Sequence, residues 1–231
     1  MSARAALGRW YASTLYPRLA PRSARQSPRL PDRPLSRRYG LERGRPIDRV
    51  YIERFLEANA RDVRGRVLEV YEGTYTERFG RDVTTADVLD TEPTARATLV
   101  GDLETGAGLP DGAYDCLIVT QTLQLVWDLR ACVATMARTL APGGVLLLSV
   151  PGISQRSEIG EQGFPDLWRF TRASVQRLLD GAFAQATAQA HGNVATSAAF
   201  LYGLAEEELP AGALTSDDPE YELVVTARAV R

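Results

Sequence analysis

Short apolar runs alternate along the chain with segments of helical periodicity. The runs lie at residues 65–70, 97–102, 114–120 and 144–150. They lack a regular alternation of apolar and polar residues, as expected of strands that are covered on both faces. Apolar residues recur at three- and four-residue steps over residues 129–140, which predicts a helix there. Strands that alternate with helices indicate an α/β fold with a doubly wound, mostly parallel sheet.

The remaining elements bring the predicted sheet to seven strands. A strand that ends near residue 90 separates the first two runs, and weaker patterns predict strands over residues 183–190 and 221–230. Thr171 is a candidate N-cap for a helix over residues 172–180, and residues 195–208 are expected to form another helix. Residues 151–165 are rich in Gly, Ser and Gln, so we expect an irregular loop over one end of the sheet.

The first residues differ in charge from the rest of the chain. Residues 1–50 contain 12 of the 27 basic residues, all of them Arg, and only 3 of the 29 acidic residues. This segment therefore carries about +9 and the remainder about −11, in agreement with the net charge of −2. Residues 3–16 could form a short amphipathic helix, with Trp10, Tyr11 and Tyr16 in or near it. Several prolines follow, and they favour an extended conformation.

These features divide the chain into a basic, Arg- and Pro-rich N-terminal arm over residues 1–46 and a domain over residues 47–231. The arm either stays a solvated tail or docks, in which case it could cover a site or mediate homo-oligomer formation. The two cysteines, Cys116 and Cys132, lie in segments expected to be buried, which indicates reduced thiols in a cytoplasmic protein. The sequence shows no membrane span, no spacing typical of metal ligands and no nucleic-acid-binding motif. We therefore expect a small-molecule substrate, no nucleic acid partner and no metal.

The turn after the first strand carries the most informative chemistry. The sequence from Gly65 to Tyr75 reads GRVLEVYEGTY, a buried strand that leads into a turn of the kind that binds nucleotides. Glycines at alternating positions let the backbone of such a turn approach a ligand closely. Here Tyr71 and Tyr75 occupy two of those positions, and only Gly73 is glycine. The ligand is therefore held differently, or the two tyrosines are core aromatics and the pocket has lost its ligand.

The order of motifs resembles that of the class I S-adenosylmethionine-dependent methyltransferases, in particular those with a type 11-like domain and a divergent glycine turn. The resemblance covers residues 47–150 and rests on Glu69 at the end of strand one, Gly101-Asp102-Leu103, LPDGAYD before strand four and RTLAPGG before strand five. It implies the Rossmann-like methyltransferase fold, with an antiparallel last strand, and S-adenosylmethionine as cofactor. Segments DLWRFT and FLYGL resemble methyltransferase-like proteins of polysaccharide and natural-product biosynthesis, which implies a small polar substrate such as a sugar or nucleoside.

The resemblance also implies which residues contact the cofactor. Glu69, Tyr71 and Gly73 would lie near its methionine part, and Glu69 could alternatively cap a neighbouring helix. Either Asp87 or Asp90 would accept hydrogen bonds from the ribose hydroxyls, and Asp87 is preferred.

Four further residues complete the expected cofactor site. Asp102 would accept from the adenine amino group and Leu103 would donate its backbone amide, unless Asp102 is only a turn residue. Thr120 and Gln121, just past strand four, would face the reactive end of the site, because ligands bind beyond the carboxyl ends of the strands in such sheets.

The catalytic residues are less well defined by the sequence. His191 is the only histidine, titrates in a useful range and is a candidate general base, although a histidine hydrogen-bonded in a turn would look the same. Asp166 and Arg169 are candidates for substrate contact, whereas Trp168 is expected to pack the loop. Three functions are compatible with the sequence: a methyltransferase, an enzyme on the same fold that has lost methyl transfer, and a non-catalytic partner protein.

Overall fold

The computed structural model describes residues 31–157 and 165–231. Residues Pro34–Arg231 form one compact unit. The helix expected over residues 3–16, with its neighbouring aromatic residues, lies outside the described residues.

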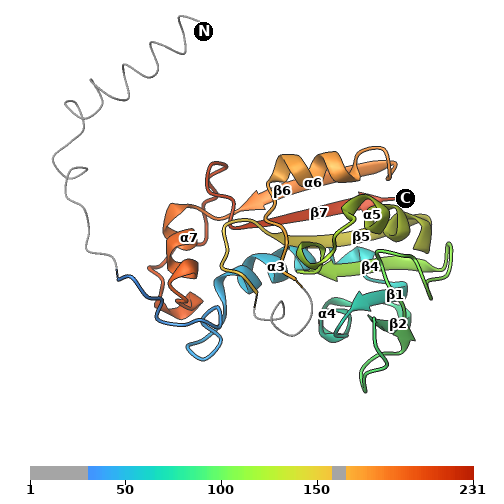
Figure 1. The fold of residues 1–231 in the computed structure, drawn as a ribbon, viewed down its shortest axis with the longest axis horizontal. Coiled ribbons are helices and arrows are strands. Elements are labelled where there is room, and N and C mark those ends of the chain that lie inside the picture. The colour runs from blue at the N-terminus through green and yellow to red at the C-terminus, as the bar shows by residue number, and fades with distance from the viewer. Residues whose placement is uncertain (1–30, 158–164) are drawn as a thin grey trace, which may run out of the picture. The chain divides into compact units, whose positions relative to one another are not determined.

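A seven-stranded sheet forms the centre of this unit (Figure 1). Its strands are β1 (Gly65–Val70), β2 (Val83–Asp90), β3 (Leu99–Val100), β4 (Tyr114–Thr120), β5 (Leu140–Pro151), β6 (Gln185–His191) and β7 (Val224–Val230). They are ordered β3-β2-β1-β4-β5-β7-β6. All neighbouring pairs are parallel except those of β7, which is antiparallel to both β5 and β6. The predicted doubly wound sheet with an antiparallel last strand is confirmed.

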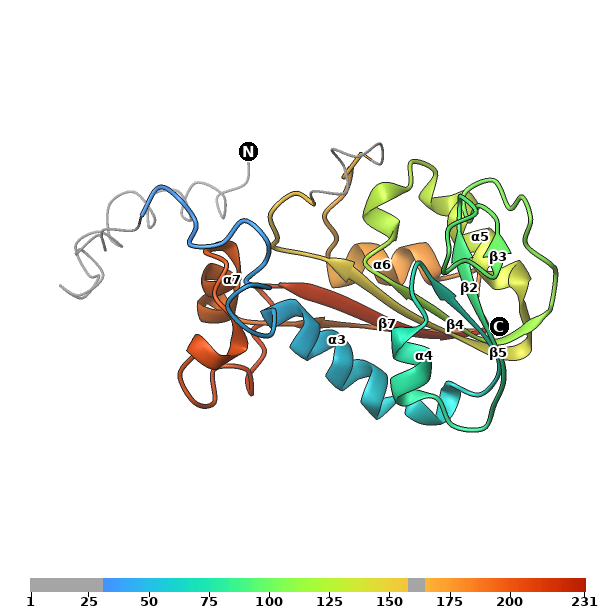
Figure 2. The ribbon, with the colours of Figure 1, turned by 90° about the horizontal axis from the view of Figure 1, so that it is seen from below.

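Helices cover both faces of the sheet, as the unbroken apolar strands require. The described helices are α3 (Ile47–Ala58), α4 (Thr74–Phe79), α5 (Leu129–Thr139), α6 (Arg172–Leu179) and α7 (Val194–Leu201). Apolar residues of α3, α4 and α7 share one core cluster with one face of the strands, and those of α5 and α6 share a second cluster with the other face. Figure 2 shows α3 and α4 below the sheet and α6 above it. Cys116 and Cys132 are buried and free, one in each cluster.

Local capping chemistry fixes where the helices begin. Asp128 accepts hydrogen bonds from two backbone amides of the first turn of α5. Thr171 and Ser174 form a reciprocal capping box at the start of α6, which confirms Thr171 as its N-cap, and Asn193 does the same for α7. Such caps satisfy amides that have no partner inside the helix.

The helix expected over residues 195–208 is interrupted. Helix α7 ends at Leu201, and a separate 3-10 helix follows at Glu206–Glu208. Gly203 between them has a φ of +71°, and a Cβ there would lie 2.4 Å from the carbonyl oxygen of Ser36. A left-handed glycine stops the helix and lets the chain before α3 approach closely.

Residues 34–46, which the sequence assigns to the N-terminal arm, pack against this break. The backbone amides of Leu35 and Ser36 donate to the carbonyl of Tyr202, and Pro46 forms a bridge with Ala205. Arg43 pairs with Glu208, and Arg45 pairs with Glu53 and Glu206. These contacts make residues 34–46 part of the same compact unit as the sheet.

Candidate functional site

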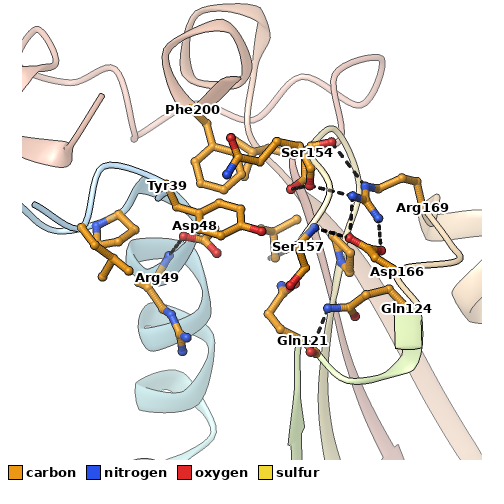
Figure 3. Close-up of a pocket in the computed structure, with 16 residues that line it drawn as sticks. Tyr39, Asp48, Arg49, Gln121, Gln124, Ser154, Ser157, Asp166, Arg169 and Phe200 are labelled. Atoms are coloured by element: carbon orange, nitrogen blue, oxygen red, sulfur yellow. Dashed lines mark hydrogen bonds and ion pairs between the residues drawn. The ribbon is translucent and has the colours of Figure 1, made fainter. Parts of the chain in front are cut away.

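A cavity of about 130 Å³ lies beyond the carboxyl ends of β4 and β5. Its walls come from four parts of the chain: residues 39–49, the turn after β4, residues 151–157 with 166–169, and the ends of α7 and β7. Figure 3 shows Tyr39, Asp48, Gln121, Gln124, Asp166 and Arg169 around it. Of the predicted site residues, the structure brings Gln121, Asp166 and Arg169 together here.

Gln121 and Gln124 place unpaired polar atoms in the wall of this cavity. Gln121 directly follows β4 with a φ of +49°, and its carbonyl accepts a hydrogen bond from Gln124 Nε2 at 2.8 Å. Among the described residues, the buried atoms Gln121 Nε2 and Gln124 Oε1 have no hydrogen-bond partner. Gln124 is only 5% exposed. Buried polar groups are normally hydrogen-bonded, so this pair of atoms marks a place where a ligand would supply the missing partners.

Asp48, in the first turn of α3, contributes a carboxylate to the same cavity. Its Oδ1 accepts a hydrogen bond from the backbone amide of Arg49 at 2.8 Å. Burial raises the pKa of Asp48, and the charge and amide of Arg49 offset that effect only in part. A carboxylate held this way is a better proton acceptor than an exposed one.

Asp166 and Arg169 form an ion pair in the wall of the cavity, and Arg169 also links residues 166–169 to residues 154–155. The two side chains form a bidentate ion pair with N–O distances of 2.5 and 3.0 Å, and Asp166 is 1% exposed. Arg169 also donates to the carbonyls of Ser154, Gln155 and Trp168, at 3.3, 2.6 and 2.8 Å. These contacts use all five N–H groups of the guanidinium. Trp168 donates its indole N–H to the carbonyl of Val126 at 2.8 Å, so it packs the loop as predicted.

Glu69 occupies a buried position at the start of α4. Its carboxylate accepts hydrogen bonds from the amides of Tyr75 and Thr76 and from the Thr76 hydroxyl, at 3.1, 2.7 and 2.7 Å. Burial raises the pKa of Glu69, while the hydrogen bonds from Thr76 and Tyr75 act against that effect. The side chain is 2% exposed. It therefore satisfies the helix N-terminus, which is the capping role left open by the sequence.

Asp87 is placed within the sheet and not at its carboxyl edge, which corrects the preference for this residue at the ribose position. It lies three residues before the end of β2. Its carboxylate accepts from Arg66, from Tyr114 Oη at 2.9 Å and from Thr98 Oγ1 at 3.1 Å. Burial opposes ionisation of Asp87, but these hydrogen bonds outweigh it and hold its pKa below the usual value. Asp90, the alternative candidate, ends β2.

Tyr71 has a backbone conformation that is typical of glycine. Its φ is +74°, a region that glycine adopts freely and tyrosine does not. The Tyr71 side chain is 52% exposed, and the guanidinium of Arg96 lies 5.2 Å from its ring centroid. The first of the two tyrosines therefore lies at the surface.

Tyr75, in contrast, is a core residue on α4. Its ring stacks on Phe79 with the centroids 6.2 Å apart, and its hydroxyl accepts from Arg49 Nη1 at 2.5 Å. Arg49 also borders the cavity. The tyrosine at the third glycine position thus supports an arginine that links this turn to the cavity.

Asp102 and Leu103 follow β3 at the carboxyl edge of the sheet. Asp102 accepts from the amide of Glu104 at 2.7 Å and from the Thr105 hydroxyl at 3.1 Å, contacts that a turn residue makes and that leave a lone pair free on each carboxylate oxygen. Within the described part of the chain, no acceptor pairs with the backbone amide of Leu103. Thr120 is the last residue of β4, and its carbonyl accepts a hydrogen bond from the Thr122 hydroxyl. The Thr120 side chain is not part of the cavity wall.

The structure places His191 outside the cavity, which does not support its predicted role as a general base. Its Nε2 lies 2.8 Å from Thr226 Oγ1, its Nδ1 lies 3.5 Å from Asp217 Oδ2, and its ring stacks on Tyr51. Burial lowers the pKa of His191, and Asp217 only partly opposes this effect. Both ring nitrogens of His191 have partners, as expected of a histidine that is held by hydrogen bonds and has a structural role.

Sequence reasoning missed Tyr39, Asp48, Arg49 and Gln124. Tyr39 and Asp48 were assigned to the arm and to the start of the domain, where no motif marks them. Gln124 lies three residues after Gln121, and that spacing at the end of a predicted strand was the available signal.

Comparison with known proteins agrees with this geometry. Residues 64–148 match a family model described as a methyltransferase domain. No curated protein matches the sequence. No helix within residues 31–157 and 165–231 has the length and apolar character needed to cross a membrane.

Solved structures share the fold at low sequence identity. A SAM-dependent methyltransferase from Archaeoglobus fulgidus is 11% identical with a TM-score of 0.52, over 79% of this chain and 94% of that one. N-methyltransferase NodS from Bradyrhizobium japonicum, in complex with S-adenosyl-L-homocysteine, is 15% identical with a TM-score of 0.51, over 85% and 93%. The [4+2]-cyclase SpnF is 14% identical with a TM-score of 0.50, over 78% and 81%. Residues 64–148 thus resemble a methyltransferase domain, and the chain shares the fold of class I S-adenosylmethionine-dependent methyltransferases.

Proposed function

We propose that the protein is an S-adenosylmethionine-dependent methyltransferase that acts on a small polar molecule. The observation that carries the proposal is the unpaired backbone amide of Leu103, next to Asp102, at the end of β3 in a methyltransferase-type domain. An amide donor beside a carboxylate acceptor matches the adjacent ring nitrogen and amino group of adenine. The family resemblance assigned these two groups to adenine.

Other residues fit the remaining parts of the cofactor. Gly73 is retained in the turn after β1, and Asp90 ends β2, where a carboxylate can accept from ribose hydroxyls. Arg49 offers a guanidinium between that turn and the cavity, suited to the cofactor's carboxylate. When bound, the cofactor would supply an activated methyl group.

A second candidate function follows from Tyr71 and Tyr75. The turn has lost two of the glycines that the family normally carries, and the fold is shared with a cyclase, SpnF. An enzyme on this fold could therefore use the cavity for a reaction other than methyl transfer.

Titration calorimetry with S-adenosylhomocysteine tests the leading proposal. We expect binding heat and a higher melting temperature, because a ligand above its dissociation constant stabilises the native state. Arg49→Gln should weaken binding by about tenfold or more, since a charged hydrogen bond is lost. Arg130→Gln, at an exposed position of α5, is the matched control and should bind normally. Absence of heat at millimolar ligand, in a folded protein, would contradict the proposal and favour the second candidate.

A further inference from the structure

We propose that the cavity beyond β4 and β5 binds an uncharged, hydroxyl-bearing acceptor, with Gln121 and Gln124 as its recognition pair and Asp48 as the group that takes the hydroxyl proton. The methyl-transfer part of this inference rests on the proposed function. The recognition part concerns the cavity alone.

The charges around the cavity argue against an anionic ligand. Arg169 donates every N–H to Asp166 or to backbone carbonyls, so it has none left for a phosphate or carboxylate. Arg49 donates to Tyr75, and the proposed function assigns its remaining N–H groups to the cofactor's carboxylate, so it is not available to the acceptor molecule. Asp48 remains as a carboxylate in the wall and would repel an anion.

The two unpaired amide atoms define what the ligand must present. The orientation of the Gln124 amide is fixed, because its nitrogen donates to the carbonyl of Gln121 and its Oε1 is therefore the free atom. Gln121 Nε2 needs an acceptor, and Gln124 Oε1 needs a donor. Hydroxyl groups supply both roles, whereas an ammonium group only donates and an ionised phosphate only accepts. The pair therefore selects hydroxyl groups.

Asp48 completes this arrangement as the proton acceptor. Tyr39, Arg49 and the Asp166–Arg169 pair line the same cavity. The Tyr39 hydroxyl lies 3.4 Å from the carbonyl of Arg156, and its ring stacks on Phe200. With the cofactor bound, the hydroxyl oxygen would form a bond to the methyl carbon while the methyl carbon–sulfur bond breaks. The sulfur would keep the electron pair of the broken bond, and the hydroxyl proton would pass to the Asp48 carboxylate and then to solvent.

A paired ligand panel tests the recognition by saturation-transfer NMR and calorimetry on the full chain. The probes are the methyl glycosides of glucose, galactose and mannose, myo-inositol, the corresponding 6-phosphates of the three sugars, and glucosamine. We expect at least one neutral probe to bind, and its phosphate or amino counterpart to bind more weakly. The inference is overturned if no neutral probe binds, or if a phosphate or amine binds more tightly than its neutral partner.

Variants locate the binding. Gln124→Leu should weaken the neutral probe by about fivefold or more, the loss of one hydrogen bond, whereas Gln189→Leu on exposed β6 should not. Thermal melts verify that each variant is folded. Equal binding by wild type and Gln124→Leu would contradict the assigned pair.

Asp48→Asn separates the proton-acceptor role from binding. The variant should retain the neutral probe's affinity and S-adenosylhomocysteine binding, yet lose transfer to a bound hydroxyl by about 100-fold or more. Unchanged transfer would overturn the role of Asp48. Because S-adenosylhomocysteine binding is measured without the probe, a failure of the proposed function is distinguished from a failure of this inference.

Discussion

Tyr114 and Asp87 are joined by a hydrogen bond of 2.9 Å that spans β1, because Tyr114 belongs to β4 and Asp87 to β2, the two neighbours of β1. Arg66 of β1 lies between them, with its Nη2 2.9 Å from Asp87 Oδ2 and its guanidinium carbon 4.6 Å from the Tyr114 ring centroid. Burial and the nearby carboxylate raise the pKa of Tyr114 to about 12. Hydrogen bonds among Arg66, Asp87 and Tyr114 thus connect β1, β2 and β4.

Tyr114→Phe should lower the free energy of unfolding by about 1.5–3 kcal/mol, the value of a hydrogen bond to a charged group. Urea unfolding monitored by circular dichroism measures the change. Tyr221→Phe, at an exposed position, is the control and should have little effect. A loss below about 0.5 kcal/mol for Tyr114→Phe would mean that Arg66 and Thr98 alone hold Asp87.

His191 is expected to make stability depend on pH. Its pKa in the folded protein is lowered from 6.5 by burial, so the unfolded chain binds the proton more readily. The stabilisation is complete above about pH 6.5 and is lost as the pH falls from there through the folded pKa. Urea unfolding between about pH 8 and pH 5 should show this loss in the wild type.

The control for this pH effect is His191→Gln, which should reduce the slope of stability against pH. The same variant should bind S-adenosylhomocysteine normally, because His191 lies outside the cavity. A pH slope equal to that of the wild type would show that other groups cause it.

Tyr71→Gly should release backbone strain at the turn after β1. A tyrosine at a φ of +74° costs about 1–2 kcal/mol relative to a residue that adopts this region freely. To separate strain from the lost contact with Arg96, the substitution is compared in an Arg96→Ala background. We expect a gain of up to about 1 kcal/mol in urea unfolding, since glycine also loses more backbone entropy on folding. The neighbouring Glu72→Gly should give no gain.

Gly203→Ala should be much more destabilising than Gly143→Ala. Both glycines have a positive φ, of +71° and +78°, but a Cβ at Gly143 meets nothing within 4 Å while one at Gly203 meets Ser36. Gly143→Ala should therefore cost about 1 kcal/mol of strain, and Gly203→Ala about 3 kcal/mol or more.

Limited trypsin digestion provides a second measurement of the Gly203 effect. Cleavage at Arg37 and Arg38 should accelerate in Gly203→Ala, because residues 34–46 lose their packing against the break after α7. Similar stability and cleavage in the two alanine variants would show that the close approach of Ser36 is unimportant.

The fold was accessible from the sequence because its signals are local and repeated. Strands β1, β4 and β5 are buried over most of their length, and their apolar runs identify them without knowledge of their neighbours. Thr171 and Gly181 bracket α6 by capping chemistry that acts over a few residues. The short β3, only Leu99–Val100, was overestimated because the apolar run there extends beyond the pairing with β2.

The site was less accessible because its residues meet only through the tertiary fold. Gln121, Asp166 and Arg169 were found, but the partners that occupy Asp166 and Arg169 were not visible in the sequence. Asp87 was preferred over Asp90 because residue type alone does not show that Arg66 and Tyr114 already surround it. Tyr39 reaches the cavity because residues 34–46 pack against the end of α7, and Asp48 reaches it from the first turn of α3.

Asp48 and Arg49 are consecutive residues in the first turn of one helix, yet they face different neighbours: Asp48 borders the cavity and Arg49 reaches Tyr75 on α4. A shift of the backbone in this turn would displace both side chains. A substitution that distorts the start of α3 is therefore expected to alter the cavity and the contact with Tyr75 together.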